Sequence, residues 1–302
     1  MGLPAMPTPM NRRKFLAATS ASVACAALEL KAASSPFGQR ICGFEKPLQF
    51  LSYTELADTM ALTGLSGIEA TVRAGGHVLP KNVEEDLPRL LEALQKRGLE
   101  ITIIATDINA ADQPHAELIL STAAKLGIRH YRMLWYRYDL HKPILPQLDQ
   151  IATKLPALAQ LTHELKMSAI YQNHSGKDIV GAPIWDIYGL IKNFDPRTIG
   201  IGFDIHHAMV EGGLSWPVQF KLIAPSLAAV YVKDFVWEKG EVKDVPLGQG
   251  RVDPKFIPMV RDLGFRGPLC LHVEYLEGSK KEDVISEAFT RDLATLRSWL
   301  RA

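Results

Sequence analysis

From residue 40 onward, hydrophobic positions alternate between two spacings along the chain. Short runs rich in β-branched residues, such as residues 100–105, are typical of buried strands. Longer stretches with apolar residues three or four apart, such as residues 84–97, are typical of helices, and Gly98 marks the end of this one. Strands are predicted at residues 41–44, 67–72, 100–105, 130–134, 166–172, 199–203, 227–235 and 269–275. Helices are predicted at residues 53–62, 84–97, 114–126, 145–165, 184–192, 215–223, 253–263 and 282–300.

Strands and helices alternate eight times within residues 40–302, which predicts an α/β protein with a single (β/α)8 TIM barrel. The competing architecture, a doubly wound open sheet, would show a glycine-rich turn after its first strand. The residues at that point, 44–47, are Phe-Glu-Lys-Pro and contain no glycine. Pro156 lies inside the predicted helix at 145–165 and should kink or split it.

The first residues do not fit the barrel pattern. Residues 11–16 read Asn-Arg-Arg-Lys-Phe-Leu and precede an apolar, alanine-rich run at 17–28. This arrangement resembles a twin-arginine (Tat) export signal, with small residues at 32–35 as a cleavage zone. The apolar run is too short for an ordinary transmembrane helix. We therefore expect residues 1–33 to be a cleavable signal, the mature protein to be periplasmic or secreted, and no stable membrane span to remain after processing.

Composition limits the classes of binding partner that we expect. The chain has a formal net charge of +1 and 47% hydrophobic residues, so nothing favours a nucleic-acid or anionic-membrane partner. Of three cysteines, Cys42 and Cys270 fall in the first and last predicted strands. These strands are neighbours in a closed barrel, but disulfide geometry is demanding, and we expect buried thiols. A homo-oligomer is compatible with the sequence.

Residues with chemical function gather where the predicted strands end. Residues 199–207 read Ile-Gly-Ile-Gly-Phe-Asp-Ile-His-His, a buried strand followed by metal-binding or proton-transferring side chains. In a parallel barrel all carboxyl ends of the strands meet at one mouth, where active sites are built. The residues that this argument brings together are Glu69, Arg73, His77, Trp135, Gln172, His174, Asp204, His206, His207, Lys233, His272 and Glu274.

An ordered set of motifs then resembles a known family, the xylose isomerase-like TIM barrels, also described as sugar phosphate isomerases and epimerases. The motifs lie at residues 67–69, 172–174, 203–208, 232–234, 246–250 and 272–275. The resemblance covers nearly the whole mature chain and implies a carbohydrate substrate. It does not specify which sugar.

The resemblance also implies a divalent metal. Epimerases of this family hold one such ion through a glutamate, an aspartate, a histidine and a glutamate at the ends of the fifth to eighth strands. By motif Asp204 and Glu274 match, whereas Gln172 and Tyr231 stand at the fifth- and seventh-strand positions. His207 matches an Asp-x-x-His pattern of the endonuclease branch. We expect one Mn²⁺ or Zn²⁺ ion. The expected ligands are Asp204, His207, His174 and Glu274. The alternative is a metal-free pocket in which these residues bind a sugar.

The residue types suit proton abstraction next to a carbonyl. The expected catalytic residues are Glu274 as the base, Glu69 or His174 as a second base, and Lys233 as an oxyanion partner. A salt bridge of Lys233 to Asp234 or Glu274 is its alternative role. The residues expected to bind the sugar are Arg73, His77, Gln172, His206 and Trp135.

Three functions remain open on the sequence alone. The first is an isomerase or epimerase of a non-phosphorylated keto sugar. The second is a lyase or hydrolase of 3-keto-glycosides that acts outside the cytoplasm, which needs only one base. The third is a catalytically weak sugar-binding barrel. An abasic-site endonuclease is disfavoured by the near-neutral charge and by the small number of histidines.

Overall fold

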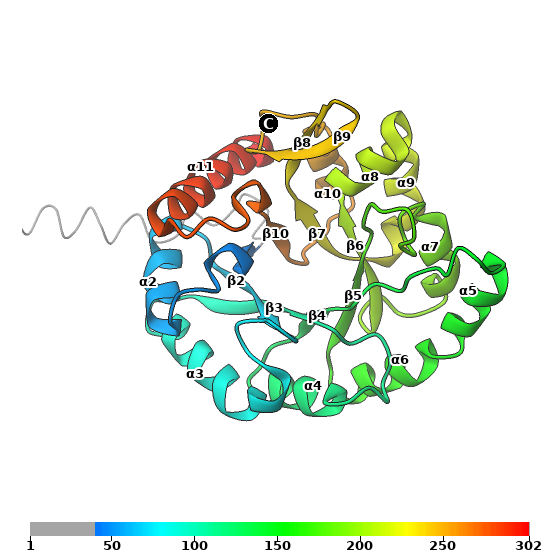
Figure 1. The fold of residues 1–302 in the computed structure, drawn as a ribbon, viewed down its shortest axis with the longest axis horizontal. Coiled ribbons are helices and arrows are strands. Elements are labelled where there is room, and N and C mark those ends of the chain that lie inside the picture. Colours follow the sequence, from blue (N-terminus) through cyan, green and yellow to red (C-terminus); the bar gives the residue numbers. More distant parts are fainter. Residues whose placement is uncertain (1–39, 302) are drawn as a thin grey trace, which may run out of the picture. The chain divides into compact units, whose positions relative to one another are not determined.

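A closed barrel of eight parallel strands forms the centre of the protein, as predicted (Figure 1). The computed structural model describes residues 40–301, so the predicted export signal lies outside the described residues. The strands are β1 (Ile41–Phe44), β2 (Gly67–Val72), β3 (Glu100–Thr106), β4 (His130–Arg132), β5 (Ser168–Gln172), β6 (Ile199–Asp204), β7 (Leu227–Val232) and β10 (Leu269–Leu271). They follow one another around the barrel in chain order, and β10 pairs with β1 to close it.

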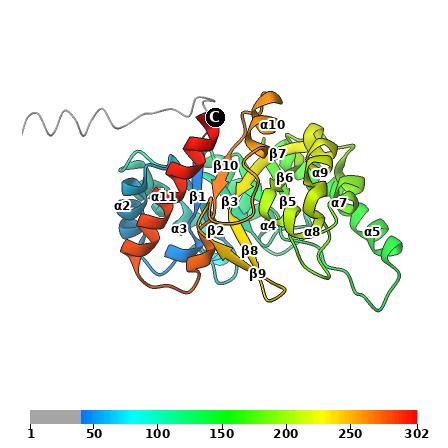
Figure 2. The same cartoon turned by 90° about the horizontal axis from the view of Figure 1, so that it is seen from above.

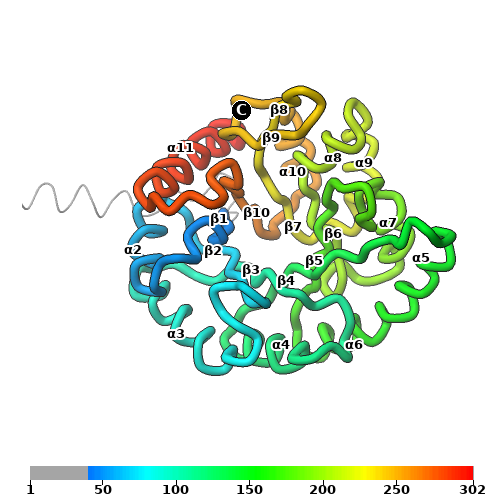
Figure 3. The backbone as a smooth tube through the Cα atoms, in the orientation of Figure 1, coloured from blue at the N-terminus to red at the C-terminus, as the bar shows by residue number. Residues whose placement is uncertain are grey.

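A ring of helices covers the outside of the barrel (Figures 1 and 3). The α-helices are α2 (Tyr53–Thr63), α3 (Val83–Gln95), α4 (Ala116–Lys125), α5 (Ile144–Ala152), α6 (Leu155–Glu164), α7 (Trp185–Ile191), α8 (Ile205–Gly212), α9 (Trp216–Ile223), α10 (Phe256–Asp262) and α11 (Glu282–Arg301). The 3-10 turns are η1 (Lys46–Leu48), η2 (Pro80–Asn82), η3 (Gly213–Ser215), η4 (Ala224–Ser226) and η5 (Glu274–Leu276). The helix predicted at 145–165 is split as expected, because Pro156 lies in the first turn of α6, where its missing N–H has no intrahelical partner to lose.

The prediction of one long strand at 227–235 is wrong at its end. After β7 the chain leaves the barrel, and β8 (Asp234–Glu238) pairs antiparallel with β9 (Glu241–Val245). This hairpin projects on the side of the carboxyl ends of the barrel strands (Figure 2). Buried Asp234 anchors it, accepting hydrogen bonds from the backbone N–H groups of Gly248, Gly250 and Val252. A carboxylate satisfied by backbone donors fixes both the hairpin and the loop that follows it.

The hydrophobic core has two parts. The larger part lies between the strands and the helices, and the smaller part fills the inside of the barrel. Inside, Cys42 and Cys270 are register partners on β1 and β10, and both are free, buried thiols as expected. Gly202 on β6 makes room for Tyr231, because a Cβ at this position would lie 2.5 Å from the ring of Tyr231. Among the described residues, no helix combines the length and the apolar character needed to cross a membrane.

Candidate active site

A chain of hydrogen bonds crosses the inside of the barrel below its mouth and links four strands. Arg132 on β4 donates from Nε to Glu69 Oε1 on β2 at 2.7 Å. It also donates from Nη1 to Gln172 Oε1 on β5 at 2.6 Å. Gln172 in turn donates from Nε2 to Asp204 Oδ2 on β6 at 2.8 Å. Strand side chains alternate between the two faces of a sheet, so these four inward-pointing residues meet across the barrel.

Sequence reasoning missed Arg132. The signal that could have found it is a charged residue between Tyr131 and Met133, in the middle of the predicted fourth strand. Its guanidinium carbon lies 4.8 Å from the ring centroid of Phe44 and 5.8 Å from that of Tyr231. Burial alone would lower the pKa of Arg132, but Glu69 raises it above its ordinary value, so the group stays charged.

Glu69 is locked into the core. It has no exposed surface, and its Oε2 lies 3.2 Å from both Cys270 Sγ and His272 Nε2. Burial alone would raise the pKa of Glu69, but Arg132 and His272 outweigh burial and lower it to about 2. A carboxylate that three donors hold ionised below the mouth serves as the counter-ion of Arg132. This environment argues against the expected role of Glu69 as a second base.

Glu274 and Lys233 form an ion pair at the mouth. Lys233 directly follows β7, and its Nζ donates a hydrogen bond to Glu274 Oε2 at the start of η5. Burial raises the pKa of Glu274, but Lys233 and His272 lower it well below its ordinary value. Burial lowers the pKa of Lys233, but Glu274, Asp204 and Asp244 raise it. The side chain of Glu274 keeps 17% of its surface exposed, so this carboxylate remains reachable from the mouth.

The two histidines after β6 lie on a helix that the sequence analysis did not predict. Asp204 ends β6 and caps α8, because its Oδ1 accepts a hydrogen bond from the backbone N–H of His207 at 3.3 Å. Asn173 fixes the backbone of Asp204 on both sides, accepting from its N–H at 2.7 Å and donating to its carbonyl at 3.1 Å. The first turn of α8 therefore brings His206 and His207 back over the end of β6.

His207 is a neutral imidazole with one unused nitrogen. Its Nδ1 lies 2.9 Å from Ser175 Oγ. Its Nε2 lies 3.7 Å from Asp204 Oδ2 and finds no hydrogen-bond partner within the described part of the chain. Burial and the nearby ammonium of Lys233 lower the pKa of His207 well below its ordinary value. A neutral imidazole with a free, buried nitrogen is a ready metal ligand.

Within residues 40–301, two side-chain groups have the geometry to hold a metal ion. One consists of Glu69, Cys270 and His272, and the other of Asp204, His206 and His207, with the ligand atoms of each group within 4.8 Å of one another. The second group fits a divalent ion better, since it offers one carboxylate and two imidazoles and includes the unused Nε2 of His207.

Two of the expected ligands are not members of that second group. The ring of His174 lies 3.8 Å from that of His207 and 4.1 Å from that of Trp135, and its Nδ1 contacts the carbonyl of Ser175. Burial and Lys233 lower the pKa of His174 to about 3. Glu274 is paired with Lys233, as described above.

Two of the four positions that the family resemblance assigns to the metal, Gln172 and Tyr231, do not supply a metal ligand. Gln172 uses its amide oxygen for Arg132 and its amide nitrogen for Asp204. Tyr231 supplies a neutral phenol, because burial raises its pKa well above the ordinary value.

The residues expected to bind the sugar divide into two kinds. His77 has both ring nitrogens engaged, with Nδ1 at 2.9 Å from Glu45 Oε2 and Nε2 at 3.0 Å from the carbonyl of Leu51. Glu45, at the end of β1, is buried and also accepts from Thr71, so His77 and Glu45 tie two mouth loops together. The sequence analysis did not single out Glu45, although a carboxylate directly after the first strand was the signal.

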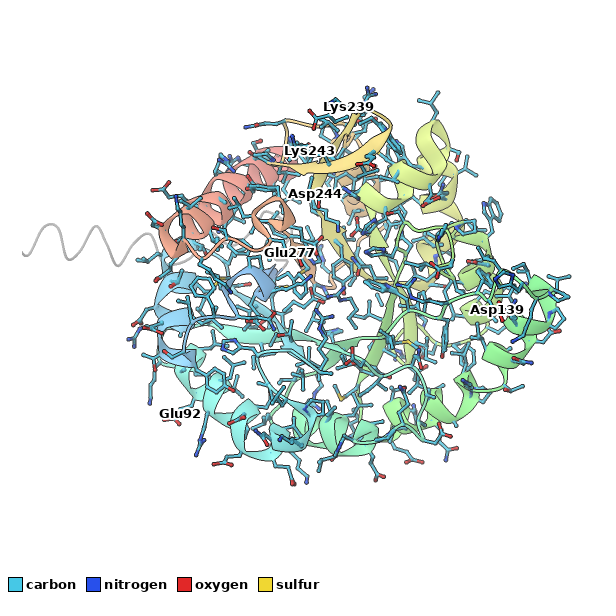
Figure 4. All side chains as sticks on the ribbon, viewed as in Figure 1. Glu92, Asp139, Lys239, Lys243, Asp244 and Glu277 are labelled. Carbon is cyan, nitrogen blue, oxygen red and sulfur yellow. The ribbon has the colours of Figure 1, made fainter. Side chains whose placement is uncertain are left out.

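Three other expected sugar-binding residues differ in how far their polar groups are engaged. The indole N–H of Trp135 is buried and has no hydrogen-bond partner within residues 40–301. Arg73 places its guanidinium carbon 6.0 Å from the ring of Phe44. His206 Nε2 lies 2.9 Å from Asp244 Oδ1 on β9, which Figure 4 shows on the barrel side of the hairpin. The hairpin thereby contributes one carboxylate to the rim of the mouth.

Comparisons with known proteins agree with this architecture. One solved structure, a D-psicose 3-epimerase in the presence of D-fructose, is 14% identical, with a TM-score of 0.65 over 87% of this chain and 100% of that chain. A D-psicose 3-epimerase with D-tagatose from Clostridium cellulolyticum is 14% identical, with a TM-score of 0.64 over 83% and 94%. A 3-keto-D-glucoside 4-epimerase from E. coli is 15% identical, with a TM-score of 0.65 over 86% and 99%. At these identities the likeness establishes the fold.

A search of curated protein sequences finds no match. The model of the family described as "Xylose isomerase-like TIM barrel" matches residues 57–297, most of the described chain. The chain therefore belongs to the xylose isomerase-like TIM barrel family.

Proposed function

We propose that this protein is an enzyme of the sugar isomerase and epimerase type that removes a proton next to the carbonyl of a non-phosphorylated keto sugar. The observation that carries the proposal is the Lys233–Glu274 pair beside the Asp204–His207 group, since Asp204 and Glu274 both raise the pKa of Lys233. A carboxylate base and a cation within reach of one substrate are what enolisation requires.

Each residue of the pair has a distinct role. Glu274 is ionised at neutral pH, so it can accept the proton from carbon. The ammonium of Lys233 can donate to the carbonyl oxygen as negative charge develops on it. When a substrate oxygen takes this hydrogen bond, Glu274 loses its strongest partner and becomes a better base.

Asp204, His206 and His207 would hold a divalent ion, Zn²⁺ or Mn²⁺. When bound, such an ion polarises the carbonyl oxygen of the substrate. The protein's own contribution is the preformed geometry of this group. Asn173 fixes the backbone of Asp204, and Ser175 orients the ring of His207 through Nδ1.

The loop after the β8–β9 hairpin supports a substrate without a phosphate group. Phosphate sites in TIM barrels are commonly built after the seventh and eighth strands. Here the backbone N–H groups of Gly248 and Gly250 in this loop already donate to Asp234. These donors are therefore committed within the protein.

A second candidate is β-elimination from a 3-keto-glycoside. Epimerisation by proton transfer uses bases on both faces of the carbon, whereas elimination needs one base and one acid. Glu69 is locked below the mouth by Arg132, and Gln172 has no basic group. Glu274 then acts as the base, and the ammonium of Lys233 protonates the leaving oxygen. The third candidate, a sugar-binding barrel with weak activity, predicts binding without turnover.

One experiment separates the three candidates. The protein is incubated in D₂O with a ketose or with a 3-keto-glycoside, with added Mn²⁺ or with EDTA. An epimerase introduces deuterium at the inverted carbon, and a lyase releases a separate leaving group. Binding of either sugar with no turnover in any condition supports the binding barrel and would refute the enzyme proposal.

A further inference from the structure

The centre of the polar network is a guanidinium group. Arg132 bonds Glu69 and Gln172 at 2.7 and 2.6 Å, and its charge lies against the rings of Phe44 and Tyr231. Its residue exposure is 5%, and its third nitrogen, Nη2, has no hydrogen-bond partner among the described residues. A buried cation with two fixed anchors is a permanent positive charge inside the barrel.

This charge lies among the side chains that the family resemblance would give to a metal ion. Gln172 turns its amide oxygen to Arg132, so its NH₂ group faces Asp204. An ion between Gln172 and Asp204 would meet a donor where it needs a lone pair. Tyr231 offers its ring to the guanidinium rather than an imidazole nitrogen to an ion.

The charges in the site also argue against a metal ion at these positions. Arg132 and Lys233 are both buried cations, and together they carry the charge of one divalent ion. Each has its own carboxylate partner, Glu69 for Arg132 and Glu274 for Lys233. A further cation beside Gln172 and Tyr231 would be repelled by the guanidinium of Arg132, which already contacts both side chains in a site that excludes water.

We propose that the guanidinium of Arg132 fills the position of the divalent ion, and that Arg132 is the positioning residue that orients Gln172 and, through it, Asp204. The inference rests on the site of the proposed function. It leaves the divalent ion of that proposal at Asp204, His206 and His207. Arg132 acts through Gln172 and does not contact the substrate.

The test counts bound Mn²⁺ by electron paramagnetic resonance in a His207→Ala background, so that the histidine group does not contribute. His207→Ala alone should bind no Mn²⁺. Adding Gln172→Glu should still bind none, because Arg132 pairs with the new carboxylate. Adding Arg132→Met to this double variant should create a site for about one equivalent of Mn²⁺. The guanidinium is then gone, and the carboxylates of Glu69, Asp204 and the substituted position 172 remain. A purely structural role for Arg132 would not produce a new metal site.

Three results would overturn the inference. The first is Mn²⁺ binding by the variant with Gln172→Glu but with Arg132 intact. The second is no binding by the triple variant when circular dichroism shows it folded. The third is binding by His207→Ala that disappears on Gln172→Ala. If Arg132→Met prevents folding, Arg132→Gln is used in its place and carries the same expectations. The count needs no substrate, so a failure of the sugar assays would refute the proposed function and leave this result standing.

Discussion

Asp204 accepts a hydrogen bond from the backbone N–H of His207, and with this contact one carboxylate ends strand β6 and begins helix α8. The same side chain accepts from Gln172 through its other oxygen. Asp204 therefore couples the network inside the barrel to the histidines at its mouth. Both oxygens are held in place before any ligand arrives, which lowers the cost of organising the site.

The dual role of Asp204 predicts that charge and fold can be separated there. Asparagine caps helices as well as aspartate does, so Asp204→Asn should keep α8. Its NH₂ group would replace the oxygen that accepts from Gln172, so the free energy of unfolding should fall by about 1–3 kcal/mol. The variant should lose the bound divalent ion, because it removes the anionic ligand. Elemental analysis and chemical denaturation check both statements, with exposed Asp195→Asn as the control. An unchanged metal content in Asp204→Asn would contradict this ligand assignment.

Glu274 is predicted to be the base. Glu274→Gln keeps the shape of the side chain and removes its basicity, so turnover should fall on the order of a hundredfold or more. Exposed Glu277→Gln, three residues away, should leave turnover unchanged. Glu69→Gln should reduce turnover as strongly only if two bases take part. Steady-state kinetics on whichever sugar the protein turns over in the D₂O experiment measures all three, and full activity in Glu274→Gln would end the assignment.

Glu69 should make the stability of the protein depend on acid pH. Its pKa in the folded state is about 2, below the ordinary value of 4.5, so its contribution is present above pH 4.5 and is lost as pH falls from 4.5 toward 2. At about 1.4 kcal/mol per pH unit the shift is worth about 3 kcal/mol. Urea denaturation across this range should show a flatter pH dependence for Glu69→Gln than for the wild type. Exposed Glu84→Gln is the control, and parallel curves for Glu69→Gln and the wild type would refute the prediction.

His77 should titrate above the ordinary value of 6.5. Burial lowers the pKa of His77, but the hydrogen bond and the charge of Glu45 outweigh burial, so the pKa is raised overall. The resulting stabilisation is present below pH 6.5 and is lost as pH rises through the pKa of the folded state. NMR titration of the ring should show this pKa fall in Glu45→Gln and stay unchanged in Glu92→Gln. A pKa that does not respond to Glu45→Gln would rule out the pairing in solution.

Export is a separate prediction from residues outside the described part of the chain. The pair Arg12-Arg13 before an apolar run predicts a twin-arginine signal in residues 1–33. Replacing both arginines with lysine should leave the precursor inside the cell, as cell fractionation would show. Normal export of this variant would refute the signal.

The sequence by itself determined the barrel and the place of its candidate site. Periodicity depends on neighbours along the chain, so the alternation of strands and helices and the split at Pro156 could be predicted residue by residue. Asp204, Lys233 and Glu274 could be expected at the mouth because parallel strands place their carboxyl ends together.

Only the tertiary structure decided which of these side chains are free to react. Glu69 and His77 looked as available as Glu274, but Arg132 and Glu45 engage them from positions 63 and 32 residues distant in the chain. Helix α8 and the β8–β9 hairpin were missed because their anchors, Asp204 and Asp234, are satisfied by backbone donors that only the fold brings near. The local sequence pattern determines on which strand or loop a charged residue lies. Burial and pairing with residues from other strands determine whether its side chain remains available for chemistry.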